Sequence, residues 1–154
     1  MIITKGLILK VLDFVTPTVE SILASENMTW GPKYINGYIN VPGIEKHPFT
    51  FGEYEEWNPE WGEEKDFSLI AGKKADVAER LGGKTSNIVA MRPWLLKKGE
   101  FLYPGGNSRS GITVAVSGAI GWVDEFIATM ILEAIIMLAQ LETDKRKERK
   151  EMEI

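Results

Sequence analysis

The longest apolar stretch of this 154-residue chain runs from Gly111 to Leu141 and restricts the fold more than any other feature. Asp124 and Glu125 divide it, so it does not supply the roughly 20 uncharged residues that a membrane span needs. Its first part, Ile112 to Val116, is rich in β-branched residues and predicts a buried strand. The remainder predicts a long helix that begins near Asp124 and is apolar around most of its circumference. We expect such a helix to be covered on two sides, by the core and by a second subunit.

Hydrophobic periodicity and turn residues predict the elements before this stretch. Apolar positions three and four apart indicate helices, whereas aromatic and β-branched runs bounded by Gly or Pro indicate strands. Because proline fits the first turn of a helix but not its interior, we expect Pro17 to begin a second helical segment capped by Thr16. In chain order we predict a helix over Leu7–Ser25, strands over Tyr34–Val41 and Pro48–Tyr54 around a Pro42-Gly43 turn, a helix over Asp66–Leu81 ended by Gly82-Gly83, and loop over Tyr103–Gly111.

Composition excludes several classes of chemistry. The chain has no cysteine, which rules out disulfides, iron–sulfur clusters, thiolate zinc sites and a cysteine nucleophile. Its single histidine, His47, is the first candidate for an axial ligand if haem binds, and it leaves no His-rich metal site. The net charge of −4 argues against a nucleic-acid surface, which needs clustered lysine and arginine.

The overall composition fits one globular domain, with 44% hydrophobic and 26% charged residues. We expect this domain to cover residues 1–142 and a charged C-terminal extension to cover residues 143–154. Lys10 and Asp13 interrupt the apolar N-terminal stretch, and no small-residue cleavage site follows it. The sequence therefore predicts a cytoplasmic protein with no membrane segment.

The segment from Glu53 to Asp66 contains seven acidic residues and a single base, Lys65. Trp57 and Trp61 lie inside it, so one interpretation is a site for a cation or a basic partner with an aromatic wall. The other interpretation is a solvated loop whose last acids favour the N-terminus of the following helix.

Asp124 and Glu125 also have two interpretations. Acids in the first turn of a helix interact favourably with its unpaired amides and its dipole, which is a sufficient structural reason for both. An acid pair can also bind a metal or act as acid and base, although adjacent helical positions point in different directions. No nucleophile and base pair can be placed, so the sequence does not assign catalysis.

Three motifs, in the right order, are similar to those of the haem-degrading-domain family. This family includes haem-binding sensors, the small protein of the glycolate operon and the C-terminal domain of one class of cobalamin adenosyltransferases. The resemblance covers roughly Asp66 to Ala128. Its motifs are Lys74-Ala75-Asp76-Val77-Ala78 followed by Leu81-Gly82 and Thr85, the glycine pair in Pro104-Gly105-Gly106, and Val116-Ser117-Gly118-Ala119 followed by Asp124-Glu125 and Ala128.

The resemblance implies an α+β domain of profilin- or PAS-like type, with a central antiparallel sheet of about five strands, flanking helices, a long C-terminal helix and symmetric homo-oligomers. Gly118 and Gly121 fit a sharp corner between strand and helix. Lys74 would project toward that corner and hold an anionic group, unless its head lies in water. The implied ligand-binding residues are Lys74, Gly105, Gly106, Ser117, Gly118, Asp124 and Glu125.

Three functions remain open at this point. The first is an oligomeric protein without strong catalysis that binds a small anionic or planar ligand. The second is a haem-binding or haem-degrading protein that uses His47. Val77 and Ala115 replace a threonine and a glycine of the family, so the haem ligand transfers less directly. The third is an oligomeric scaffold or adaptor for a protein partner, with the acidic segment as part of its surface.

Overall fold

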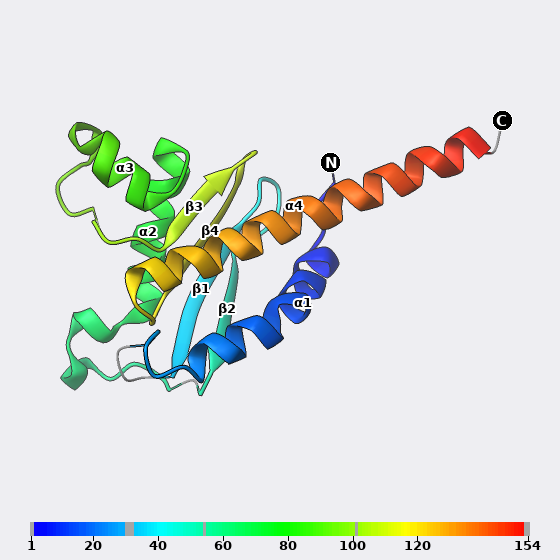
Figure 1. Ribbon diagram of the computed structural model, residues 1–154. Coiled ribbons are helices and arrows are strands. Elements are labelled where there is room, and N and C mark those ends of the chain that lie inside the picture. Colours follow the sequence, from blue (N-terminus) through cyan, green and yellow to red (C-terminus); the bar gives the residue numbers. More distant parts are fainter. Residues whose placement is uncertain (1, 30–32, 54, 101, 153–154) are drawn as a thin grey trace.

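A four-stranded antiparallel sheet with helices on both faces forms the centre of the computed structural model, which describes residues 2–29, 33–53, 55–100 and 102–152 (Figure 1). The strand order is β2-β1-β4-β3. The main elements are α1 (Lys5–Leu23), β1 (Tyr34–Asn40), β2 (His47–Gly52), α2 (Phe67–Leu81), α3 (Thr85–Met91), β3 (Gly106–Arg109), β4 (Ile112–Ser117) and α4 (Gly121–Met152). Short 3-10 turns cover Pro59–Trp61 (η1), Glu63–Lys65 (η2) and Pro93–Leu95 (η3). The predicted α+β class and the long C-terminal helix are confirmed, with four strands among the described residues.

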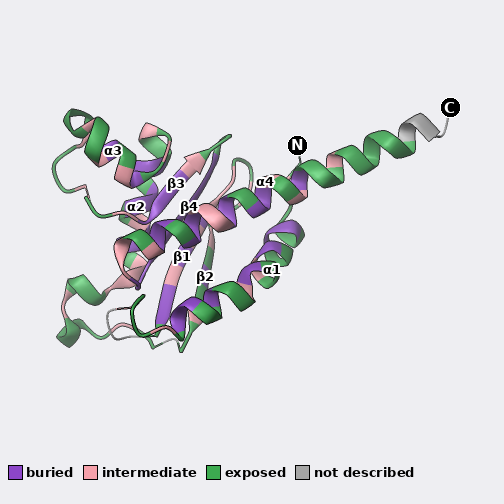
Figure 2. Cartoon of the chain, in the orientation of Figure 1, coloured by how far each residue is buried: buried purple, intermediate pink, exposed green. Residues whose placement is uncertain are grey.

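The two faces of the sheet differ in chemistry because side chains alternate along each strand. On β1, Ile35 and Ile39 face α1 and α4 and are fully buried. Asn36 and Tyr38 face the other way, where the Tyr38 hydroxyl bonds Ser68 of α2 at 2.6 Å. The apolar core therefore lies between the sheet and the α1–α4 layer, as the buried faces of these helices show in Figure 2. The α2 side is more polar.

The predicted first helix is confirmed, but the break at Pro17 is wrong. α1 continues from Lys5 to Leu23 with Pro17 inside it. The Thr16 hydroxyl donates to the Leu12 carbonyl one turn back instead of capping a new helix. Val15 and Val19 are buried on either side of the proline, so packing against the core holds the helix continuous despite the missing N–H.

The hairpin and the second helix are close to their predictions. β1 and β2 pair as neighbouring strands, as predicted, and their antiparallel register places Ile39 opposite His47. Tyr54, which we placed at the end of the second strand, lies outside the described residues. α2 begins after Asp66, whose carboxylate accepts the Leu69 N–H, and it ends at Gly82.

The loop predicted over Tyr103–Gly111 is wrong in part, because residues 106–109 form β3 and pair with β4. The two strands join through Ser110 and Gly111, which both have positive φ angles, as a tight hairpin requires. The polar side chains of β3 find partners on α4: the Asn107 amide donates to the Thr129 hydroxyl at 3.1 Å. These partners are distant in sequence, so the local pattern indicated a loop.

Helix α4 begins three residues before the predicted Asp124 and continues without interruption into the charged extension. Its last turns project from the body of the molecule (Figure 1), and exposed residues dominate them (Figure 2). No helix among the described residues is long and apolar enough to cross a membrane.

Two glycines test the packing on the two sides of the sheet, Gly37 on the apolar face of β1 and Gly72 on α2. A Cβ on Gly37 would overlap the Phe49 ring and lie 2.7 Å from the Ala115 carbonyl oxygen. Gly72 lies inside α2, and its Cβ would meet nothing closer than 3.9 Å. We expect Gly37→Ala to lower the free energy of unfolding by about 1–3 kcal/mol and Gly72→Ala to raise it by about 0.5–1 kcal/mol. Urea denaturation of both variants measures the effect; equal stabilities would contradict this packing.

Candidate functional site

The corner between β4 and α4 is built on a glycine that no other residue could replace easily. Gly118 follows the last residue of β4 and has a φ of +132°. A Cβ at this position would lie 2.5 Å from the Tyr34 carbonyl oxygen. Gly121, the first residue of α4, packs close to Pro104, where a Cβ would lie 3.1 Å from the ring. Both positions agree with the sharp corner expected from the sequence.

A buried ion pair joins α2 to this corner. Lys74 Nζ lies 3.1 Å from Asp124 Oδ2 and donates to the Val116 carbonyl at 3.0 Å. The two side chains are only 3% and 2% exposed. The interpretation that the lysine head lies in water is therefore wrong, and Lys74 does reach the predicted corner.

Burial dominates the protonation of both partners. It raises the pKa of Asp124 to about 6, although Lys74 and the backbone N–H groups of Ala119 and Gly118 oppose this rise. It also lowers the pKa of Lys74, against the opposing attraction of Asp124. The Asp124 Oδ1 atom accepts the Ala119 N–H at 2.9 Å. Asp124 therefore holds both the backbone of the corner and the side chain of Lys74 in place.

Glu125 lies next to Asp124 in sequence but serves a different part of the molecule. Its Oε1 accepts the Ser86 N–H at 2.9 Å, in the first turn of α3. The buried Thr85 hydroxyl accepts the N–H groups of Gly105 and Gly106 at 3.0 and 3.2 Å. As the sequence indicated, the two adjacent acids point in different directions, and each has a structural role.

The corner also contains a pocket of about 270 Å³, called the corner pocket below. It is lined by the ion pair, by the backbone of the corner and by aromatic and aliphatic side chains. Its lining residues are Glu64, Phe67, Ile70, Lys74, Tyr103, Ser117, Gly118, Ala119, Gly121 and Asp124.

Ser117 contributes a hydroxyl to the corner pocket, and the residue as a whole is 3% exposed. Asn36 stands opposite it on β1, and the buried Asn36 Oδ1 atom has no hydrogen-bond partner among the described residues. Buried polar groups are normally hydrogen-bonded, so this exception beside a pocket residue indicates a place where a polar group from outside the chain binds.

The structure brings together four of the seven predicted ligand-binding residues, since Lys74, Ser117, Gly118 and Asp124 line the corner pocket. Gly105 and Gly106 instead pack behind the lysine, where a Cβ on Gly106 would lie 2.9 Å from the Lys74 carbonyl oxygen. Glu125 points toward α3.

Sequence reasoning missed the apolar wall of the corner pocket. Phe67 and Ile70 precede Lys74 by seven and four positions, which places all three on one face of α2. That spacing in the sequence could have predicted that Phe67 and Ile70 lie beside Lys74. Tyr103 and Glu64 come from segments without regular periodicity, and nothing in the local sequence pointed to them.

His47 lies away from the corner pocket. It is the first residue of β2 and stands opposite Ile39, on the face of the sheet that packs against α1 and α4. Ser117 pairs with Asn36 and faces α2, nearer the other end of β1. His47 therefore does not reach a ligand in the corner pocket.

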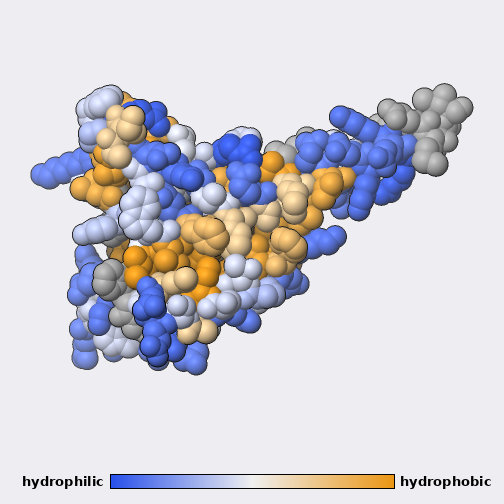
Figure 3. All heavy atoms as spheres, in the orientation of Figure 1, coloured by the Kyte–Doolittle hydropathy of each residue, from blue (hydrophilic) through white to orange (hydrophobic). Residues whose placement is uncertain are grey.

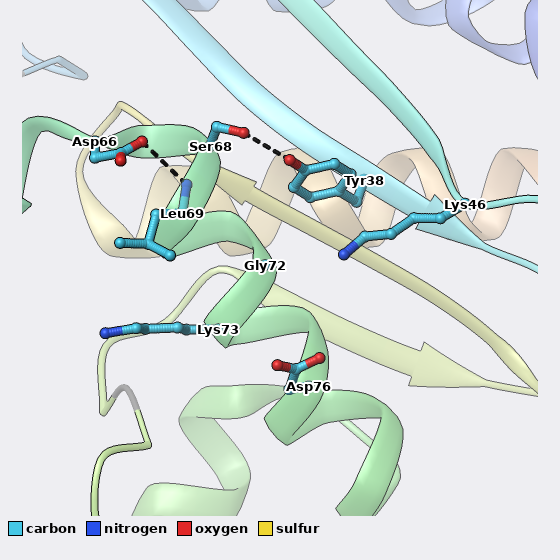
Figure 4. Close-up of a pocket in the computed structure, with 8 residues that line it drawn as sticks. All are labelled: Tyr38, Lys46, Asp66, Ser68, Leu69, Gly72, Lys73 and Asp76. Atoms are coloured by element: carbon cyan, nitrogen blue, oxygen red, sulfur yellow. Dashed lines mark hydrogen bonds between the residues drawn. The ribbon is translucent and has the colours of Figure 1, made fainter. Parts of the chain in front are cut away.

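A second hollow, of about 440 Å³, lies between α2 and the β1–β2 hairpin (Figure 4). Its polar groups already contact one another, since Lys46 Nζ lies 4.1 Å from the centre of the Tyr38 ring and the Tyr38 hydroxyl bonds Ser68. The Asp66 carboxylate caps α2 at Leu69.

No family model matches the chain, and no curated protein or solved structure matches it either. Within the described residues, no group of three or more His, Asp or Glu side chains is arranged to hold a metal ion. The chemistry of the site therefore rests on Lys74, Asp124 and Ser117 and on their surroundings.

The ion pair makes a prediction about pH. A rise of the Asp124 pKa from 3.8 to about 6 means that the folded state holds this proton more tightly than the unfolded chain does. This group therefore lowers the free energy of unfolding as the pH rises from about 4 to about 6, by roughly 3 kcal/mol. Carbon-detected NMR of the Asp124 carboxyl should show a midpoint near 6.

Lys74→Met is the matched variant, because it removes the positive charge that favours the ionised acid. Its Asp124 midpoint should move above that of the wild type, and its free energy of unfolding at pH 7 should fall by about 3–5 kcal/mol, since the acid then lacks its partner. An Asp124 midpoint near 4 that does not respond to Lys74→Met would contradict the buried pair.

Proposed function

We propose that this protein is a small-ligand-binding member of the haem-degrading-domain family, with a profilin- or PAS-like fold, and that its ligand occupies the corner pocket. The motifs that resemble the family converge on one place in the fold. Lys74, the glycine pair, Ser117-Gly118 and Asp124 all meet around the β4–α4 corner. Among the described residues, the site holds an ion pair and the Ser117 hydroxyl but no nucleophile activated by a neighbouring base, which favours binding over catalysis.

The pocket hydroxyl of Ser117, with the buried and unpartnered Asn36 Oδ1 atom opposite it, is the observation that carries this proposal. Leaving a buried polar atom without a hydrogen bond costs about 1–3 kcal/mol. Thr113, four residues before Ser117 on the same face of β4, has a partner inside the protein, since its hydroxyl donates to Ser108 at 2.8 Å. A ligand group that bonds Ser117 and reaches Asn36 Oδ1 would remove this cost.

The shape of the corner pocket favours a ligand of metabolite size. Its volume of about 270 Å³ lies at the lower end of ligand pockets, which span about 300–1,000 Å³. Phe67, Ile70 and Tyr103 offer flat or aliphatic surfaces to a planar ring. A haem macrocycle needs far more space, and His47 lies on the other face of the sheet.

The charges favour an acidic group on that ligand. A carboxylate bound beside Ser117 would disfavour the ionised form of Asp124, because like charges repel. Asp124 would then take up a proton, which requires little free energy near neutral pH because its pKa is about 6. The positive charge of Lys74 would then interact with the carboxylate of the ligand instead of with Asp124.

Ser117→Ala tests the site without touching the ion pair. We expect it to weaken binding of planar carboxylates about tenfold, the equivalent of one hydrogen bond. The ligand-free variant should melt at about the same temperature as the wild type, because the substitution removes no hydrogen bond to another described residue. The probes are benzoate, nicotinate and a set of aliphatic carboxylates, followed by calorimetry.

Ser108→Ala is the matched control, since it removes a hydroxyl that is already bonded on the neighbouring strand. It should lower the melting temperature and leave the affinity unchanged. Haem titration of the same samples by absorbance should give no stoichiometric Soret shift. A shift that disappears in a His47 variant, or carboxylate binding that is indifferent to Ser117→Ala, would overturn the proposal.

Proton uptake gives a separate prediction. If ligand binding protonates Asp124, the affinity for a carboxylate probe should rise as the pH falls from 8 toward 6. Calorimetry in buffers of different ionisation enthalpy would count the protons taken up. A pH-independent affinity and no proton uptake would contradict the role of Asp124.

A further inference from the structure

The outward face of α4 carries large apolar side chains that the rest of the described chain leaves uncovered. Trp122, Phe126, Met137 and Leu141 are 69%, 55%, 45% and 48% exposed. With the half-buried Met130 and with Glu133 they form one row along the helix, called the α4 stripe below. In Figure 3 apolar atoms gather across the α1–α4 layer, whereas the projecting end of α4 is hydrophilic.

The spacing of the α4 stripe identifies its occupant. Its positions are separated by four, four, three, four and four residues, which reads the same in both directions. A two-fold interface requires that residue i meets residue j and that residue j meets residue i. Two antiparallel copies of the stripe satisfy this rule, with Trp122 facing Leu141, Phe126 facing Met137 and Met130 facing Glu133 of the other copy.

Glu133 does not oppose this pairing, because its charge is already compensated. Arg109 of β3 binds it through two nitrogen atoms, at 2.9 and 2.6 Å. The pair is half exposed and lies at the centre of the α4 stripe. The stems of the two side chains therefore offer apolar surface to Met130 of the other copy.

The projecting end of α4 supports the same arrangement by its charge. Residues 145–149 contain four bases and one acid. In the antiparallel pairing they extend about 5–10 Å past Gly121 of the other copy, at 1.5 Å per residue. The acidic segment lies there, since Glu64 lines the corner pocket together with Gly121 and Asp124. Opposite charges thus meet at both ends of the pairing.

We infer that two copies of the chain form an antiparallel homodimer through the α4 stripe, with the basic end of each α4 beside the acidic Glu63-Glu64 segment of the other copy. This arrangement also explains why a helix continues so far from its own domain. Among the described residues, the side-chain hydrogen bonds at this end of α4 lie within the helix itself, as between Gln140 and Asp144. An isolated helical end of this length is marginal in water without a partner.

Cysteine cross-linking tests the register directly, because the chain contains no cysteine of its own. A mixture of the Phe126→Cys and Met137→Cys variants should form a disulfide-linked dimer on mild oxidation. Phe126→Cys alone should not, since its two copies would be about 16 Å apart along the helices. A mixture of Phe126→Cys and Leu141→Cys, one turn out of register, is the control. Equal cross-linking of all three samples would overturn the register.

Met137→Glu tests the interface, with Met91→Glu as the matched control on α3, where the methionine is 70% exposed. Sedimentation should show a dimer for the wild type and for Met91→Glu. Met137→Glu should weaken the dimer at least about 100-fold, because each substitution occurs twice. A monomeric wild type, or a Met137→Glu variant that remains a dimer, would overturn the proposal.

Salt tests the ends of the pairing. The double variant Lys145→Glu with Lys147→Glu should weaken the dimer about tenfold at low ionic strength, and the difference should vanish in concentrated salt. An unchanged dimer affinity at low salt would refute the contact between the basic end and the acidic segment. The cross-linking result is independent of this outcome.

Discussion

The Lys74–Asp124 ion pair connects the three main elements of the candidate site. Lys74 belongs to α2, Asp124 lies in the first turn of α4, and the Val116 carbonyl that accepts from the lysine belongs to β4. A buried ion pair contributes little net stability, because desolvation of both charges offsets their attraction. Removing one partner is costly, however, since the other charge remains buried. The pair therefore fixes the position of α2 relative to the β4–α4 corner more than it stabilises the fold.

The division of the sheet into an apolar face and a polar face explains where the site lies. The face toward α1 and α4 is closed by Ile35, Ile39 and the helices, and it holds most of the core. The face toward α2 carries Asn36, Tyr38 and Asn40, and the side-chain oxygens of the two asparagines are buried without a partner among the described residues. The α2 layer also buries small apolar side chains, including Ala71, Val77 and Ala78. This layer nevertheless retains polar groups at some energetic cost, which is typical of a binding face.

Much of this arrangement is readable from the sequence where the signal is local. The hairpin follows from Pro42-Gly43, α2 from its spacing and its glycine end, and the β4–α4 corner from Gly118 and Gly121. β3 was missed because its residues, Gly106 to Arg109, are polar and lack the pattern of a strand, although they pair with β4 and two of them find partners on α4, Thr129 and Glu133. The apolar lining of the corner pocket could be predicted from the sequence only in part. Phe67 and Ile70 share a face of α2 with Lys74, whereas Tyr103 lies in a segment without periodicity.

The length of α4 gives the corner a mechanical consequence. The helix has 32 residues, so it is about 48 Å long at 1.5 Å per residue. Its first turn borders the corner pocket, and its far end projects from the domain. A small rotation of the helix therefore produces a large displacement at its C-terminal end: a tilt of about 10° at Gly121 would move that end by about 8 Å, by the same helix geometry. A tilt of α4 that leaves the sheet in place would thus change the position of the projecting end substantially.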